Sequence, residues 1–147
     1  MPKTIPSAFS GATKQGEHRD CVVRAISNVS GKCYDEVHAL LKKYGRKDCC
    51  GTYWETSEKA LRSLGYKAVY IGTSRAAKYN GMYRSQPYES KNKTLQTLVK
   101  ELPRGKFVVF IRGHATALID GKIVDTFDNK ANARVTAIYY HHDEVFA

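Results

Sequence analysis

A cysteine near the start of the chain stands where a reactive thiol could form. Residues 15–26 read QGEHRDCVVRAI. The apolar residues that begin there recur at the spacing of one buried helical face: Val22, Ala25, Ile26 and Val29. Asp20 occupies the expected N-cap position, so Cys21 falls at about the first helical residue. Unpaired N–H groups and the helix dipole stabilise a thiolate there. The spacing therefore indicates either a nucleophile or a packed thiol.

A histidine later in the chain could serve as the base that such a thiol needs. A cysteine becomes a useful nucleophile when a histidine takes its proton and a third group orients that histidine. Of the five histidines, His38 is expected on the surface of a charged helix, and His141 and His142 close the last expected strand without an obvious partner. His114 begins an expected strand directly after Gly113, which leaves room beside the ring. We therefore predict His114 as the base.

Hairpin geometry supplies an orienting acid for His114. Asp120 and Gly121, between two alternating segments, are a strong signal for a two-residue turn. With that turn, Asp125 on the return strand lies on the same face as His114, one diagonal step away, whereas Asp128 points to the opposite face. A carboxylate in this position can hold the imidazole in one tautomer and favour the imidazolium.

These residues follow one another in an order known from a family of enzymes. Gln15 stands six positions before Cys21, which opens a helix, and the histidine and the acid follow on strands. This order resembles the papain-like cysteine peptidases, most closely the compact bacteriocin-leader peptidases and similar small phage-encoded proteins. The resemblance implies that Cys21 is the nucleophile. It further implies that His114 is the general base, that Asp125 orients it, and that Gln15 helps to form the oxyanion hole.

The resemblance covers roughly residues 15–128 and rests on the order of elements rather than on extended identity. Val22 follows the cysteine, where the family often has glycine. The step of eleven residues from His114 to Asp125 is short for the family, although a tight hairpin accounts for it. The family also includes transferases, deamidating toxins and inactive members, so the fold alone does not determine the reaction.

The elements that must position these residues are three helices followed by a sheet. We expect helices at 21–30 and 34–44, and a third that starts at a capping box formed by Thr52 and Glu55. A short helix is expected at 94–101. The expected strands are 66–72, 106–112, 114–120, 122–128 and 134–141. This order predicts an α+β fold, and the resemblance implies its papain-like form, with the nucleophile helix packed on a small antiparallel sheet.

Length and composition limit the other possibilities. The 147 residues predict a single domain, 1–147, with a flexible arm at 1–15. The polar start lacks the apolar block of a secretory signal, and no apolar run approaches the length of a membrane span, so we expect no membrane partner. A cytoplasmic location is expected, which is the host cytoplasm if the protein is phage-encoded. Cysteines stay reduced there.

Cys49 and Cys50 are expected to have structural roles. Cys49 and Cys50 precede the third expected helix without a nearby histidine, so we expect both thiols to be packed rather than reactive. No CxxC pair is matched by a second one, so a structural zinc is not expected. The cysteine-peptidase chemistry that the resemblance implies needs no cofactor.

A long basic loop is expected at 73–93. It carries five basic residues, one acidic residue and interleaved tyrosines. Such a loop suits single-stranded nucleic acid, a flap over an acidic or extended peptide, or a solvated excursion. We prefer the flap, and its candidate substrate-binding residues are Tyr79, Tyr83, Arg84 and Tyr88.

The predicted function is a thiol protease or a related thiol-dependent amide hydrolase that acts on a peptide or protein. The alternative is a non-catalytic binding module on the same fold. Its net charge of +10 would then capture an acidic protein partner or nucleic acid. Nucleic acid is the less favoured partner, because a basic pI is common in small proteins. Deamidation, group transfer and an inactive descendant stay open.

Overall fold

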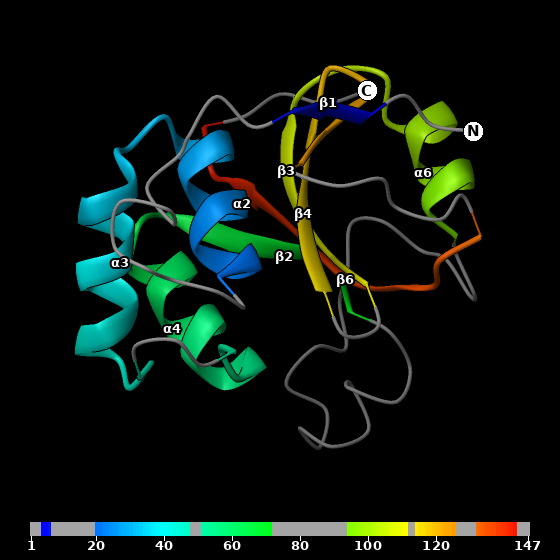
Figure 1. The fold of residues 1–147 in the computed structure, drawn as a ribbon. Coiled ribbons are helices and arrows are strands. Elements are labelled where there is room, and N and C mark those ends of the chain that lie inside the picture. The colour runs from blue at the N-terminus through cyan, green and yellow to red at the C-terminus, as the bar shows by residue number, and fades with distance from the viewer. Residues whose placement is uncertain are drawn as a thin grey trace.

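Helices lie on both sides of a central sheet (Figure 1). The sheet is almost entirely antiparallel, which makes the fold α+β. The structure is a computed structural model that describes residues 4–6, 20–47, 51–71, 94–111, 114–125 and 132–143. Three helices cover one face of the sheet, and a shorter helix covers the other. No helix in these ranges is long and apolar enough to cross a bilayer.

Three ten-residue helices form the first half of the described chain: α2 (Cys21–Ser30), α3 (Tyr34–Lys43) and α4 (Trp54–Ser63). The predicted bounds of α2 are confirmed. It ends at Gly31, whose φ of +76° is a conformation that glycine adopts without strain. Helix α3 ends one residue before the predicted position, and α4 begins after the predicted start.

The predicted capping box of α4 is wrong. The helix begins at Trp54, and its N-cap is Tyr53, which makes no side-chain cap hydrogen bond. Tyr53 takes the extended conformation of an N-cap, with φ −64° and ψ 148°. Thr52 therefore lies one residue before the N-cap, and Glu55 is the second helical residue. A capping box needs these residue types at the N-cap and at the third helical residue.

The described strands form one sheet in the order β1-β5-β4-β3-β6-β2. Their bounds are β1 Thr4–Pro6, β2 Tyr66–Ile71, β3 Lys106–Ile111, β4 His114–Ile119, β5 Lys122–Asp125 and β6 Val135–His141. All neighbouring pairs are antiparallel except β1 and β5, which are parallel. Strand β1 falls inside the arm that was expected to be flexible. The predicted strand residues 126–128 lie outside the described ranges, as does the loop 73–93.

The hairpin of β4 and β5 has the predicted two-residue turn. Ile119 pairs with Lys122, and both turn residues have positive φ: 49° at Asp120 and 79° at Gly121. This geometry matches the right-handed twist of the two strands. The Asp120 side chain is also fixed, because Oδ1 accepts a hydrogen bond from the N–H of Gly105 at 3.1 Å.

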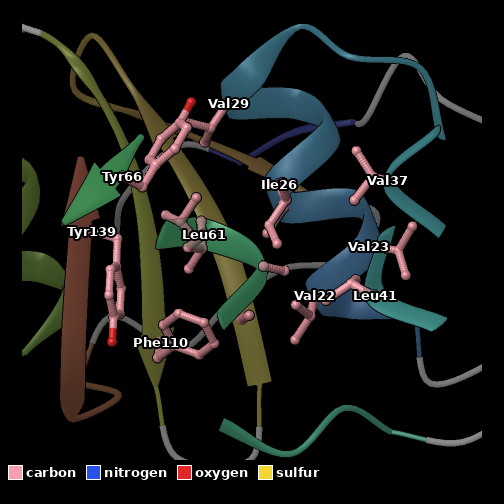
Figure 2. Packing of buried hydrophobic residues seen from close by; sticks show 14 of the residues in the cluster. Val22, Val23, Ile26, Val29, Val37, Leu41, Leu61, Tyr66, Phe110 and Tyr139 are labelled. Carbon is pink, nitrogen blue, oxygen red and sulfur yellow. The ribbon is translucent and has the colours of Figure 1, made fainter. Parts of the chain in front are cut away.

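Two hydrophobic clusters hold the layers together. The first joins α2, α3 and α4 to the sheet, and Figure 2 shows Ile26 and Leu61 directed toward Phe110 and Tyr139. Helix α2 packs on β4, where Ala115 and Ala117 are buried. Their small side chains allow the helix to lie close to the strand. The second cluster covers the other face, under α6 (Leu95–Glu101).

Candidate active site

Cys21 is the first residue of α2, as predicted, and is partly buried. The next two residues, Val22 and Val23, are buried in the first cluster and anchor this end of the helix. Helix α2 packs on β4, so the first turn of α2, which contains Cys21, lies beside the sheet. The thiol and His114 are therefore held by two elements that pack directly against each other.

His114 and Asp125 form a hydrogen-bonded pair. The Nε2 atom of His114 lies 2.7 Å from Oδ2 of Asp125, and the two side chains are only 12% and 6% exposed. His114 begins β4 and Asp125 ends β5, on the two arms of the hairpin. The register places them one diagonal step apart on the same face, which confirms the predicted geometry.

Cys21 completes a chain of three groups. Burial is the largest influence on His114 and lowers its pKa. Hydrogen bonds to Asp125 and Cys21, together with electrostatic interactions with both side chains, outweigh burial and raise the pKa of His114 from 6.5 to about 9. Since Asp125 engages Nε2, Nδ1 is the ring nitrogen that remains for the thiol. At neutral pH a pKa of about 9 keeps His114 as the imidazolium.

The raised pKa makes stability depend on pH. The folded pKa of His114 lies above the unfolded value, so its contribution is complete below about pH 6.5 and is lost as the pH rises through about 9. We expect the free energy of unfolding of the wild type, minus that of His114→Gln, to fall by at most about 3 kcal/mol between pH 6 and pH 9.5. Urea titrations at several pH values measure this difference. A constant difference would contradict the raised pKa.

The burial and the side-chain partners of Asp20, the residue before Cys21, were not predicted from the sequence. Asp20 is 4% exposed and occupies the N-cap position of α2, as predicted, but it makes no side-chain cap hydrogen bond. Its Oδ2 atom accepts hydrogen bonds from the hydroxyl of Tyr34 at 2.7 Å and from Nε of Arg24 at 3.1 Å. The spacing of Asp20 and Arg24, one helical turn apart, could have suggested the ion pair. Nothing local pointed to Tyr34, on the next helix.

The expectations for the other histidines were wrong. His38 is buried rather than on the surface, and its ring stacks on Tyr34 with the centroids 5.9 Å apart. His142 has a partner, because its Nδ1 lies 2.9 Å from the carbonyl oxygen of Gly65. Together with Asp143, His141 and His142 form the one group in the described ranges whose potential metal-ligand atoms lie within 4.8 Å of one another. The exposed Asp143 side chain lies 3.2 Å from Nε2 of His142.

Other predicted residues lie outside the described ranges. These are the oxyanion-hole candidate and the substrate-binding candidates: Gln15, Tyr79, Tyr83, Arg84 and Tyr88. Cys49 and Cys50 also lie outside them. Of the described cysteines, Cys33 is exposed and precedes α3, and it is free like Cys21.

Comparisons with known protein families, curated proteins and solved structures identify no relative of this chain. No family model, no curated protein and no solved structure matches the chain significantly.

Proposed function

We propose that the protein is a thiol-dependent amide hydrolase. The observation that carries the proposal is the chain of contacts from Cys21 through His114 to Asp125. A thiol at a helix start, an imidazole and a buried carboxylate are the three groups that nucleophilic catalysis by cysteine requires. Within this class we propose a cysteine peptidase of papain-like form, because the helix that carries the thiol packs on the strand that carries the base.

The reaction proceeds by acyl transfer. The Cys21 thiolate attacks the amide carbonyl carbon and forms a C–S bond, while the carbonyl oxygen becomes an oxyanion. His114 donates its proton to the nitrogen as the C–N bond breaks, and the amine leaves. His114 then takes a proton from water, which attacks the thioester. The C–S bond breaks, the acid is released, and the proton restores the imidazolium–thiolate pair.

The oxyanion and the substrate need further groups. The backbone N–H of Cys21 belongs to the first turn of α2 and would donate to the oxyanion. We propose Gln15 as the second donor and residues 73–93 as a flap over an extended, acidic peptide. The positive net charge favours such a peptide by long-range attraction. Both cysteines of the described ranges are free thiols, which suits a reducing compartment, so we propose a cytoplasmic location.

Cys33 provides an internal control for the reactivity of Cys21. Both cysteines stand at the start of a ten-residue helix, and Cys33 is the more exposed. Of these two cysteines, only Cys21 contacts a histidine within the described residues. We expect iodoacetamide at pH 6 to modify Cys21 about tenfold faster than Cys33. Peptide mass spectrometry resolves the two sites, and equal rates would count against the proposal.

Turnover separates a peptidase from related activities. A mixture of acidic and neutral peptides is incubated with the wild type and with Cys21→Ser, and the products are identified by mass. Cleavage adds one water across a peptide bond, whereas deamidation converts a side-chain amide to an acid without breaking the backbone. Peptide cleavage by the wild type alone is expected. Side-chain deamidation alone would overturn the peptidase assignment, and no turnover by either protein would overturn the hydrolase.

A further inference from the structure

Asp20 occupies a capping position but does not cap. An N-cap aspartate ordinarily has extended backbone and accepts a hydrogen bond from the second or third N–H of its helix. Thr94 behaves in this way at the start of α6, with φ −103° and ψ 163° and its hydroxyl accepting from the N–H of Thr97. Asp20 has φ −105° and ψ 26° instead. Its carboxylate is therefore used elsewhere.

Two side chains hold the Asp20 carboxylate. The hydroxyl of Tyr34 donates to Oδ2 at 2.7 Å, and this bond is buried. Nε of Arg24 donates to the same oxygen at 3.1 Å, and the Arg24 side chain is 22% exposed. Tyr34 itself is fully buried at the start of α3. The carboxylate thus links the beginnings of two helices and is paired with a cation.

The position of this carboxylate affects the residue that follows it. A carboxylate that capped α2 would occupy first-turn N–H groups and would add a negative charge beside the Cys21 sulfur. Both effects disfavour a thiolate at the helix start. The Asp20 carboxylate is instead held by Tyr34, so it leaves the first-turn N–H groups uncapped, and its charge is neutralised by Arg24. The N–H groups of the first turn then have no side-chain cap from Asp20.

We propose that Asp20 is a positioning residue. Tyr34 and Arg24 hold its carboxylate away from the first turn of α2, which reserves the N–H groups of that turn for the Cys21 thiolate and for the oxyanion formed by its attack. The proposal rests on the proposed hydrolase function, and it assigns Tyr34 and Arg24 a role in the reactivity of a thiol that neither needs to touch.

The test compares two buried tyrosines. Tyr34→Phe removes the hydroxyl that holds Asp20. Tyr139→Phe is the matched control, because Tyr139 is also fully buried in the first cluster but its hydroxyl has no hydrogen-bond partner among the residues that the structure describes. We expect Tyr34→Phe to lower the ratio of Cys21 to Cys33 alkylation at pH 6 by about three- to tenfold. We expect kcat to fall similarly with KM unchanged, and Tyr139→Phe to leave both as in the wild type.

A double variant distinguishes positioning from a loss of structure. In the Asp20→Ala background no carboxylate remains to move, so adding Tyr34→Phe should change the alkylation ratio less than twofold. The free energy of unfolding of each variant is measured in urea. If Tyr34→Phe lowers only this free energy and leaves the ratio and kcat at wild-type values, the proposal is overturned.

Arg24→Gln offers a second route if Tyr34→Phe does not fold. It removes the cation but keeps the buried Tyr34 bond, and it should slow Cys21 alkylation at pH 6, more strongly at low salt. An unchanged rate at both salt concentrations overturns the proposal. Failure of the hydrolase function is seen separately, because the wild type would then turn over no peptide, whatever the alkylation ratio of the Arg24 and Tyr34 variants.

Discussion

Replacing His114 by alanine is expected to lower kcat/KM for amide hydrolysis by about a thousandfold. In the proposed mechanism His114 would protonate the leaving amine, and its imidazolium would also stabilise a thiolate at Cys21. The variant loses both effects. The preference of iodoacetamide for Cys21 over Cys33 at pH 6 should fall in parallel, which shows that the loss begins at the thiol. Peptide cleavage and site-resolved alkylation are measured on the same preparation.

His142→Ala is the matched control for that experiment. His142 is an exposed histidine that directly follows β6 and contacts the carbonyl oxygen of Gly65 and the side chain of Asp143. Its removal should leave kcat/KM and the alkylation ratio within twofold of the wild type. If His114→Ala behaves like His142→Ala, then His114 is not the base.

Two substitutions of Asp125 should separate orientation from charge. In Asp125→Asn the amide oxygen still accepts the hydrogen bond from Nε2 of His114, so the ring keeps its tautomer. Asp125→Ala removes both the hydrogen bond and the negative charge. We expect kcat/KM at pH 7 to fall by about a hundredfold or more in Asp125→Ala and by less than tenfold in Asp125→Asn.

The effect of the Asp125 charge should also be visible in the dependence of kcat/KM on pH. Hydrolysis needs the His114 imidazolium as an acid, so wild-type kcat/KM should fall as the pH rises through about 9. Asp125→Asn removes a charge that raises the pKa of His114, so its decline should begin at lower pH. Alkylation of Cys21 does not need the acid and should not fall in this range. A profile of Asp125→Asn that matches the wild type would contradict the role of the carboxylate charge.

Local signals explain why part of the site could be predicted from the sequence. The apolar stripe of α2 and Gly31 determine where that helix begins and ends. The position of Cys21 as its first residue could therefore be predicted. The turn at Asp120 and Gly121 determines the register of β4 and β5, and the register places His114 beside Asp125. Each inference needs only residues that are close together in the chain.

Contacts between distant segments could not be predicted in this way. The hydrogen bond from Tyr34 to Asp20 depends on how α3 packs against α2, and the burial of His38 depends on the same packing. The parallel pairing of β1 with β5 joins opposite ends of the chain, and no local pattern marks it. The shift at the start of α4 depends on the backbone conformation of Tyr53.

The order of the strands along the chain determines when, during synthesis, Cys21 can contact His114. During synthesis Cys21 leaves the ribosome long before His114 and Asp125, and β2 pairs with the described sheet only through β6, which follows all of them. Until the later strands assemble, the nascent chain carries an ordinary cysteine without a base. If the protein is the proposed hydrolase, it is therefore inactive while it is being made, since His114 and Asp125 meet only when nearly the whole described sheet has been translated.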